Sequence, residues 1–252
     1  MTLFDELRPV VEGGGRAVVF TIIAGDQLGA KVLVREDGST VGDGPAELAA
    51  LAPDALRAGR SHLIEHGDST LFADVFGPPP RLLVYGAIDT AEALCRAAKL
   101  LGWTTIVADA RARFATAERF PSADELLVVW PEDALAQVQP DLGTAIVVLT
   151  HDDKFDVPML IGSLATEAFY VGALGSRRNQ ERRNELLRDA GVAESDVGRI
   201  AGPCGLDIGA ESPAETALSM LTEILAVRAG RSGGRLKDAP RRIHADPVAA
   251  KK

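Results

Sequence analysis

The stretch RLLVYGAIDTAEAL, residues 81–94, decides the fold of this chain. Its apolar run 81–85 has the length of a buried strand, Gly86 follows, and an amphipathic helical pattern begins directly afterwards. A strand, a tight turn and a helix in this order open a nucleotide-binding unit. A dinucleotide-binding turn carries G-x-G-x-x-G, whereas Ile88 and Ala91 stand at the second and third glycine positions here. The stretch therefore predicts the scaffold of such a unit with a weakened turn.

The pattern of short apolar runs continues along the chain. Four further runs have strand length: 104–109, 125–130, 145–150 and 168–174. Helix-like stretches separate them: 89–101, 131–139, 156–166 and 176–190. A last helical pattern opens at Ser212, where Pro213 and Glu215 complete a capping box. Apolar strands alternating with helices indicate an α/β fold with a Rossmann-like parallel sheet and helices on both faces.

The first third of the chain has a different, strand-rich pattern. The run 16–24 is β-branched, and Asp37-Gly38 and Gly67-Asp68 stand between alternating segments, which is typical of hairpins. Three prolines in GPPPR, residues 77–81, then interrupt both helix and central strand. We expect three parts: a smaller strand-rich α+β domain over 1–78, a Rossmann-like domain over 79–230, and a basic, flexible tail over 231–252.

Composition excludes several classes of protein. The 252 residues carry a formal net charge of −9, which argues against a general nucleic-acid binder, because phosphate contacts need clustered Lys and Arg. No apolar run approaches the roughly 20 residues that span a bilayer, and the N-terminus lacks the basic region of a signal peptide. Two cysteines make no disulfide framework and fit a reducing compartment. We expect a cytoplasmic protein with no nucleic-acid or membrane partner.

Ligands of an open parallel sheet bind at the carboxyl ends of its strands, where the strand order reverses. That rule selects the loops after four predicted strands: 86–89, 109–111, 150–154 and 172–178. Asp109 stands about 20 residues beyond Gly86, where a dinucleotide fold has the acid that binds a ribose hydroxyl. An Asp after a strand also caps the following turn. Both interpretations of Asp109 stay open.

The stretch GALGSRR, after the fifth predicted strand, favours an anion site. Gly175 permits close backbone approach, and Ser176 can cap a helix whose first turn carries Arg177 and Arg178. Free N–H groups, the positive end of a helix and two guanidiniums suit a phosphate. The alternative is a solvated helix face on which Arg177 pairs with Glu181.

Three further side chains have chemical potential. His151 is the one histidine predicted at the carboxyl edge, either as an anion donor and proton carrier or as an ordinary turn residue. Cys204 lies between glycines in GPCGLDIGA and is expected near the surface of a loop, either inert or in contact with sulfur or a soft metal. Cys95, inside a helical pattern, is expected in the core. No metal site is predicted.

These motifs together resemble the XdhC/CoxI family of xanthine dehydrogenase accessory proteins. The similarity runs through most of the chain: GAKVLVREDGS, LLVYGA, AKLLGW, VADARARFATAERFP, VVLTHDDKFD, YVGALGSRR and GLDIGAESPAETALSMLTEILAVRAGRSGG. The resemblance implies a chaperone that binds the molybdenum cofactor (molybdopterin) as cargo and promotes its sulfuration with a cysteine desulfurase. It implies delivery to the large subunit of a xanthine dehydrogenase- or CO dehydrogenase-type molybdenum hydroxylase, and an accessory protein rather than a self-contained enzyme.

The hypothesis of a cofactor chaperone, combined with the chemistry of these loops, predicts where the cofactor binds. Its anionic end would meet the helix terminus in YVGALGSRR, the THDD stretch would line the pterin side, and the GPCGLDIGA stretch would close the cleft. The predicted cofactor-binding residues are Gly86, Asp109, His151, Asp152, Gly175, Ser176, Arg177, Arg178, Cys204 and Asp207.

The sequence departs from the family pattern in two places. A Cys-Leu-Glu run after the first hairpin is replaced by GDGPAELA, with Pro45 and Ala46 and no cysteine. The family's G-A-G-H turn reads Gly86-Ala87-Ile88-Asp89, so a glycine and a histidine are missing and a carboxylate would repel a pyrophosphate. Two alternative functions stay open: an NAD(P)-binding oxidoreductase, which Asp109 supports, and a cofactor-free partner-binding relative, which the departures support. The apolar N-terminal hairpins are compatible with a homodimer.

Overall fold

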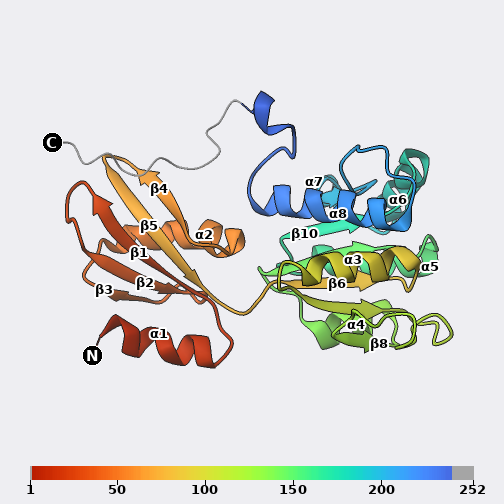
Figure 1. The fold of residues 1–252 in the computed structure, drawn as a ribbon, viewed down its shortest axis with the longest axis horizontal. Helices are drawn as coiled ribbons and strands as arrows, with labels where there is room; N and C mark the ends of the chain where they lie inside the picture. The colour runs from red at the N-terminus through yellow and green to blue at the C-terminus, as the bar shows by residue number, and fades with distance from the viewer. Residues whose placement is uncertain (1, 240–252) are drawn as a thin grey trace. The chain divides into compact units, whose positions relative to one another are not determined.

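The stretch that decides the fold forms the strand, turn and helix that its sequence predicts. The computed structural model describes residues 2–239, and in it β6 (Arg81–Tyr85) leads through a turn at Gly86 into α3 (Asp89–Lys99) (Figure 1). Contacts within the chain define two units: one over Pro79–Gly233, and one formed by the residues up to Pro78 together with the described residues from Gly234 onward. The expected tail beyond residue 239 lies outside the described residues. None of the helices within residues 2–239 combines the length and apolar character that crossing a membrane requires.

The second unit is built on a six-stranded parallel sheet with the order β11-β10-β9-β6-β7-β8. The other strands are β7 (Thr104–Ala108), β8 (Glu125–Leu127), β9 (Thr144–Val148), β10 (Tyr170–Ala173) and β11 (Ile200–Ala201). All five neighbouring pairs are parallel. The chain runs outward from β6 to β8, returns to β9 beside β6, and continues to β11. This is the doubly wound order, and it reverses between β6 and β9.

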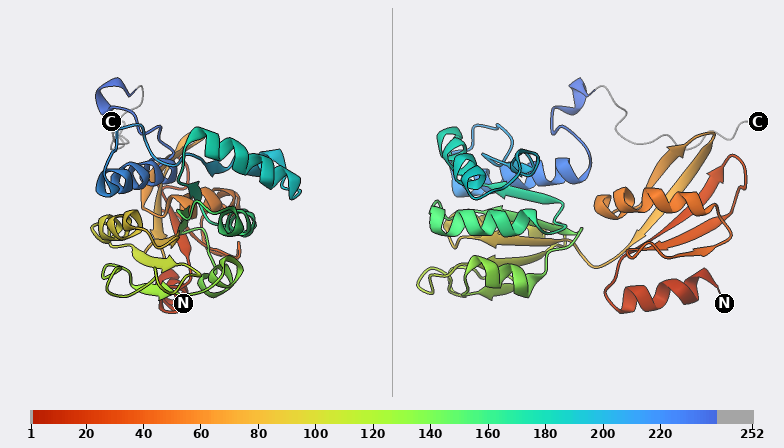
Figure 2. Two further views of the ribbon diagram at one scale, coloured as in Figure 1. Left: turned by 90° about the vertical axis from the view of Figure 1, so that its right-hand side faces the viewer. Right: turned by 180° about the vertical axis from the view of Figure 1, so that it is seen from behind.

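Helices cover both faces of this sheet, which confirms the predicted fold class (Figure 2). The remaining helices are α4 (Pro131–Val138), α5 (Asp153–Leu164), α6 (Arg177–Asp189), α7 (Glu194–Val197) and α8 (Pro213–Arg228). Leu82 and Val84 of β6 pack with α3 and α8, whereas Leu83 and Tyr85 point to the other face and pack with α4, α5 and α6. The strand is apolar at every position from Leu82 because both of its faces are buried. Cys95 lies in the α3 core with no exposed surface, as predicted.

The first unit is an antiparallel sheet of five strands in the order β3-β2-β1-β5-β4. Its elements are α1 (Leu3–Glu12), β1 (Ala17–Ala24), β2 (Lys31–Arg35), β3 (Thr40–Gly42), η1 (Ala46–Leu51), α2 (Ala52–Ala58), β4 (His62–His66) and β5 (Ser69–Phe76). Both predicted hairpins are present. Helix α1 was not predicted; it contains Pro9, and the side chain of Thr2 caps it with Asp5 in a capping box.

Two element boundaries differ from the prediction for local reasons. Strand β8 ends at Leu127 rather than at residue 130, because Trp130 becomes the N-cap of α4 and Pro131 its first residue. Helix α5 begins at Asp153 rather than at 156, because the Asp152 side chain accepts a hydrogen bond from the Lys154 N–H and caps it.

Candidate functional site

Gly86 lies at the point where the strand order reverses. Its φ is +120°, and a Cβ at this position would lie 2.9 Å from the backbone of Leu149 and Thr150. The turn after β6 therefore approaches the end of β9 too closely for any other residue. Gly86 is required by the packing of two backbones, independently of any ligand.

Asp109, the predicted ribose-binding acid, is almost completely buried, at 1% exposure. Its carboxylate accepts hydrogen bonds from the Ala87 N–H at 2.8 Å, from the Arg111 N–H at 2.9 Å, and from Arg111 Nε and Nη2 at 2.9 and 2.8 Å. Burial raises the pKa of this carboxyl, but the bonds from Arg111 and Ala87 outweigh it, so the pKa is lowered overall. This favours the interpretation of Asp109 as the residue that holds the turn and orients Arg111.

At the positive end of α3, Asp89, which the sequence analysis singled out, pairs with Arg119, which it missed. Arg119 Nη1 donates to the carbonyls of Ala87 and Phe114, at 3.0 and 2.8 Å, and Nη2 donates to Asp89 Oδ1 at 3.0 Å. A carboxylate of the chain itself therefore lies where a dinucleotide fold receives a pyrophosphate.

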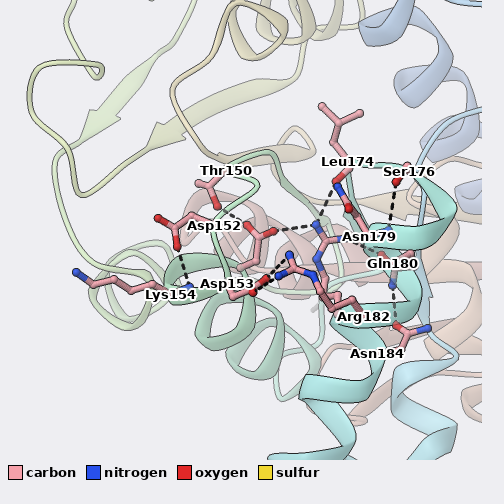
Figure 3. Close-up of polar contacts among 12 residues, drawn as sticks. Thr150, Asp152, Asp153, Lys154, Leu174, Ser176, Asn179, Gln180, Arg182 and Asn184 are labelled. Carbon is pink, nitrogen blue, oxygen red and sulfur yellow. Dashed lines mark hydrogen bonds and ion pairs between the residues drawn. The ribbon is translucent and has the colours of Figure 1, made fainter.

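The turn after β10 has the predicted cap. Ser176 accepts a hydrogen bond from the Asn179 N–H at 3.2 Å and begins α6 (Figure 3). Arg177 and Arg178 are exposed in the first turn. Within residues 2–239, neither guanidinium forms an ion pair with another described residue, and the alternative Arg177–Glu181 pair is not formed. The two cations thus stand at the end of a helix whose own dipole they oppose.

A buried polar network connects the loops after β9 and β10. Arg183 of α6 lies 2.8 Å from Asp156 of α5, with side-chain exposures of 3% and 2%. Arg183 Nη2 also donates to the Leu174 carbonyl at 3.2 Å, and the Thr150 hydroxyl donates to Asp156. Arg183 Nη1 donates to Gln180 at 2.6 Å. Nothing in the sequence distinguished Arg183 from its neighbours, and the network holds the two candidate loops in a fixed relation.

The loop after β9 presents the predicted His151 and Asp152 at the same edge of the sheet. His151 is exposed and has a φ of +58°, a left-handed conformation that few non-glycine residues adopt. Beside it, Arg182 forms two hydrogen bonds with Asp153, at 2.6 and 2.9 Å, that tie α6 to the first turn of α5 (Figure 3). Across residues 2–239, no three His, Cys, Asp or Glu side chains converge on a possible metal position.

The expectation for Cys204 was wrong: the residue is buried, at 8% exposure, instead of lying near a loop surface. Its N–H donates to the Ala173 carbonyl at 3.0 Å, and the neighbouring Gly205 N–H donates to Glu223 of α8 at 2.8 Å. Tyr170 donates to the same carboxylate, so the loop is drawn inward. Burial first, and Glu223 second, raise the pKa of the Cys204 thiol to about 12. This favours the inert interpretation, whereas Asp207 is exposed in the same loop.

With this geometry established, comparisons with known proteins identify the family. The sequence profile of the XdhC Rossmann domain matches residues 82–224. The chain belongs to the XdhC family. The resemblance inferred from the sequence is thereby confirmed, and the match covers the parallel sheet and the helices on both of its faces.

Three curated relatives resemble the chain. An uncharacterized protein of Escherichia coli K12, YqeB, is 32% identical over 228 residues, covering 81% of this chain and 41% of YqeB. A protein of Bacillus subtilis named as a probable xanthine dehydrogenase subunit is 33% identical over 167 residues, covering 66% of this chain and 48% of that protein. The molybdenum cofactor insertion chaperone PaoD of Escherichia coli K12 is 29% identical over 153 residues, covering 61% of this chain and 42% of PaoD. The chain spans less than half the length of each relative.

The fold is also shared with a solved structure. The crystal structure of a xanthine dehydrogenase from Bacillus halodurans superposes with a TM-score of 0.63 at 22% identity, over 90% of this chain and 67% of that one. At this identity the likeness concerns the fold.

Proposed function

We propose that this XdhC protein binds the molybdenum cofactor as cargo and serves in the maturation of a molybdenum hydroxylase. Family membership supports the proposal. The similarity to a molybdenum cofactor insertion chaperone and to a probable xanthine dehydrogenase subunit supports it as well. The partners in this role are the large subunit of the hydroxylase, which receives the cofactor, and a cysteine desulfurase, which supplies sulfur. The cytoplasm is the expected compartment.

The observation that carries the proposal is the pair of guanidiniums at the start of α6 that form no ion pair with another residue among 2–239. Arg177 and Arg178 stand at a capped helix N-terminus, where the macrodipole adds about half a positive charge. A phosphate there would receive backbone N–H groups and two charge-assisted donors, each worth about 1.5–3 kcal/mol. An anion would also relieve the repulsion between the two arginines and the helix end.

Neighbouring residues support the remaining part of the site. Thr150 and Leu174 belong to the two loops that the Asp156–Arg183 pair joins, so His151 and Asp152 are held beside the turn that begins α6. We assign His151 and Asp152 to the pterin side of the cargo and the exposed Asp207 to its outer edge. Gly86, Asp109 and Gly175 act as parts of the scaffold, and Cys204 packs beneath it.

Anaerobic titration of the purified chain with released molybdenum cofactor tests this function. We expect micromolar or tighter affinity and a loss of at least about tenfold for Arg177→Ala combined with Arg178→Ala. Arg188→Ala is the matched control, because Arg188 lies at the far end of the same helix and pairs with Glu194. Unchanged affinity in the double variant would contradict the placement. A wild-type chain that captures the large hydroxylase subunit but no cofactor would instead establish a partner-binding relative.

The geometry does not favour the second candidate, an NAD(P)-dependent oxidoreductase. Asp109 uses both carboxylate oxygens on Ala87 and Arg111, and Asp89 lies at the helix end that would receive the pyrophosphate. A ribose and a pyrophosphate would each have to displace a bonded side chain of the protein.

A further inference from the structure

Trp130 is the most conspicuous exposed aromatic side chain at the carboxyl edge of the parallel sheet. It is 45% exposed, stands between β8 and α4, and makes no side-chain hydrogen bond in capping that helix. The other tryptophan of the chain, Trp103, is 4% exposed. An indole left in contact with water at the edge where this fold binds ligands offers a stacking surface.

The loop after β9 completes the surroundings of this indole. The Phe155 ring lies 5.4 Å from the Trp130 ring, tilted by 48°. The Lys154 ammonium lies 4.7 Å from the Trp130 centroid and 5.6 Å from that of Phe155. Lys154 has a flexible stem and no ion pair with another residue among 2–239. Its charge rests on an aromatic face, an arrangement worth only about 0.5–1 kcal/mol at an exposed position.

A second cation, Arg111 in the loop after β7, contacts the ring of Phe155. The Arg111 guanidinium lies 5.4 Å from the Phe155 centroid and 4.6 Å from that of Phe114. Asp109 holds it through Nε and Nη2, which leaves Nη1 for another partner. The buried acid thus fixes an arginine at the sheet edge with one donor group to spare.

Asp152 adds an acceptor on this side of α5. One of its oxygens accepts from the Lys154 N–H at 3.1 Å, which leaves the other for a ligand. In Figure 3, the Asp152 and Lys154 side chains extend on the side of α5 away from Arg182. Asp152 also contributes, after Asp109, to the raised pKa of Arg111, so the two side chains are within electrostatic reach of each other. An acceptor carboxylate, a stacking indole and an exposed ammonium are therefore gathered by two loops, and Arg111 is contributed by a third.

We propose that Trp130, Asp152 and Lys154 form a subsite for a planar 2-amino-4-oxopyrimidine ring, as in a pterin or guanine, that carries an anionic substituent. The ring stacks on the indole, and its N–H and amino groups donate to the Asp152 carboxylate. The Lys154 ammonium leaves the aromatic face to pair with the anionic group, and Arg111 Nη1 offers a second donor. The choice of a pterin as the natural ring rests on the proposed function, which this assignment deepens. The phosphate turn, by which we mean the start of α6 with Arg177 and Arg178, remains a separate contact.

The test uses the full chain and pterin-6-carboxylate, with binding followed by calorimetry in all variants and by quenching of tryptophan fluorescence in the wild type. We expect saturable binding that Trp130→Leu weakens at least about tenfold and Trp130→Phe largely retains. Asp152→Asn keeps the helix cap but exchanges an acceptor for a donor, so it should also lose about tenfold. Phe72→Leu, at an exposed aromatic position of the first unit, is the control.

Three further arms separate the possible outcomes. Lys154→Met should weaken pterin-6-carboxylate but leave neutral 6-hydroxymethylpterin unchanged. GMP should bind in competition and AMP should not, since adenine lacks the donor edge; equal binding of AMP would overturn the role of Asp152. The double variant of Arg177 and Arg178 should retain pterin-6-carboxylate, so the ring subsite and the phosphate turn fail independently. Affinity that is unaffected by Trp130→Leu, or absent for the wild type, would overturn the subsite.

Discussion

The Arg183 guanidinium of α6 and the Asp156 carboxylate of α5 form an ion pair at 2.8 Å, with both side chains almost completely removed from water. Thr150 and Leu174, from two different strand-end loops, bond to its two members. The preceding arginine along the helix, Arg182, pairs with Asp153 at 2.6 Å, but its side chain is 54% exposed. Two adjacent ion pairs between the same helices therefore differ chiefly in their exposure to solvent.

This difference predicts unequal costs of mutation. Asp156→Asn leaves a buried guanidinium without its counter-charge and should lower the free energy of unfolding by about 3–5 kcal/mol. Arg182→Met removes a screened pair and should cost less than about 1 kcal/mol. Urea denaturation of both variants measures the contrast. Equal costs would mean that burial does not set the strength of the Asp156–Arg183 pair.

A second prediction concerns the first Rossmann turn. Wild-type chain should show no heat of binding with millimolar NAD, because Asp89 lies where the pyrophosphate would be received. Asp89→Ser combined with Ile88→Gly should gain measurable affinity, since Arg119 and the end of α3 then face an anion. Adding Arg119→Met should abolish the gain. Wild-type binding at micromolar NAD would contradict this interpretation of the turn.

The third prediction follows from the two buried thiols. Burial raises the pKa of Cys95 and of Cys204 to about 12, with smaller contributions from Glu92 and Glu223, respectively. Both should resist alkylation in the native chain at pH 8 and react in urea. Because an unfolded thiol ionises from about pH 8.5, while the folded one stays protonated, stability should fall as the pH rises from about 8.5 towards 12. A chain that lacks both thiols, Cys95→Ala with Cys204→Ala, should show a weaker decline.

The fourth prediction concerns Asp109. Asp109→Asn should lower the free energy of unfolding at pH 7 by about 1–3 kcal/mol, since bonds to Arg111 and Ala87 lose their charged acceptor. The folded-state pKa is lowered from 3.8, so this contribution is present above the unfolded pKa and is lost as the pH falls through the folded one. Denaturation at pH 7 and at pH 3 checks the sign: the difference between variant and wild type should shrink in acid.

Sequence patterns predicted what depends on local chemistry. The doubly wound sheet followed from apolar runs buried on both faces, and the Ser176 and Ser212 caps followed from hydrogen-bonding groups within one helical turn. Both hairpins followed from their turn residues.

Features that depend on distant partners could not be read in this way. Arg182 and Arg183 are adjacent in sequence and both pair with a carboxylate of α5, but only the Arg183 side chain is buried. Cys204 is drawn inside because Glu223, on another helix, bonds to the neighbouring N–H and to Tyr170. Arg119 reaches the α3 turn from 30 residues further along the chain. In each case the sequence supplied the side chain, and the tertiary fold selected its partner.

The Asp89–Arg119 pair has a consequence for the protein in the cell. Any protein that binds a ligand only when folded gains stability by mass action as the ligand concentration rises. A Rossmann turn that carries its own carboxylate gains no stability from the cellular pool of NAD. Changes in the cellular NAD concentration should therefore leave the stability of this unit unchanged, and its Tm should be the same with or without NAD.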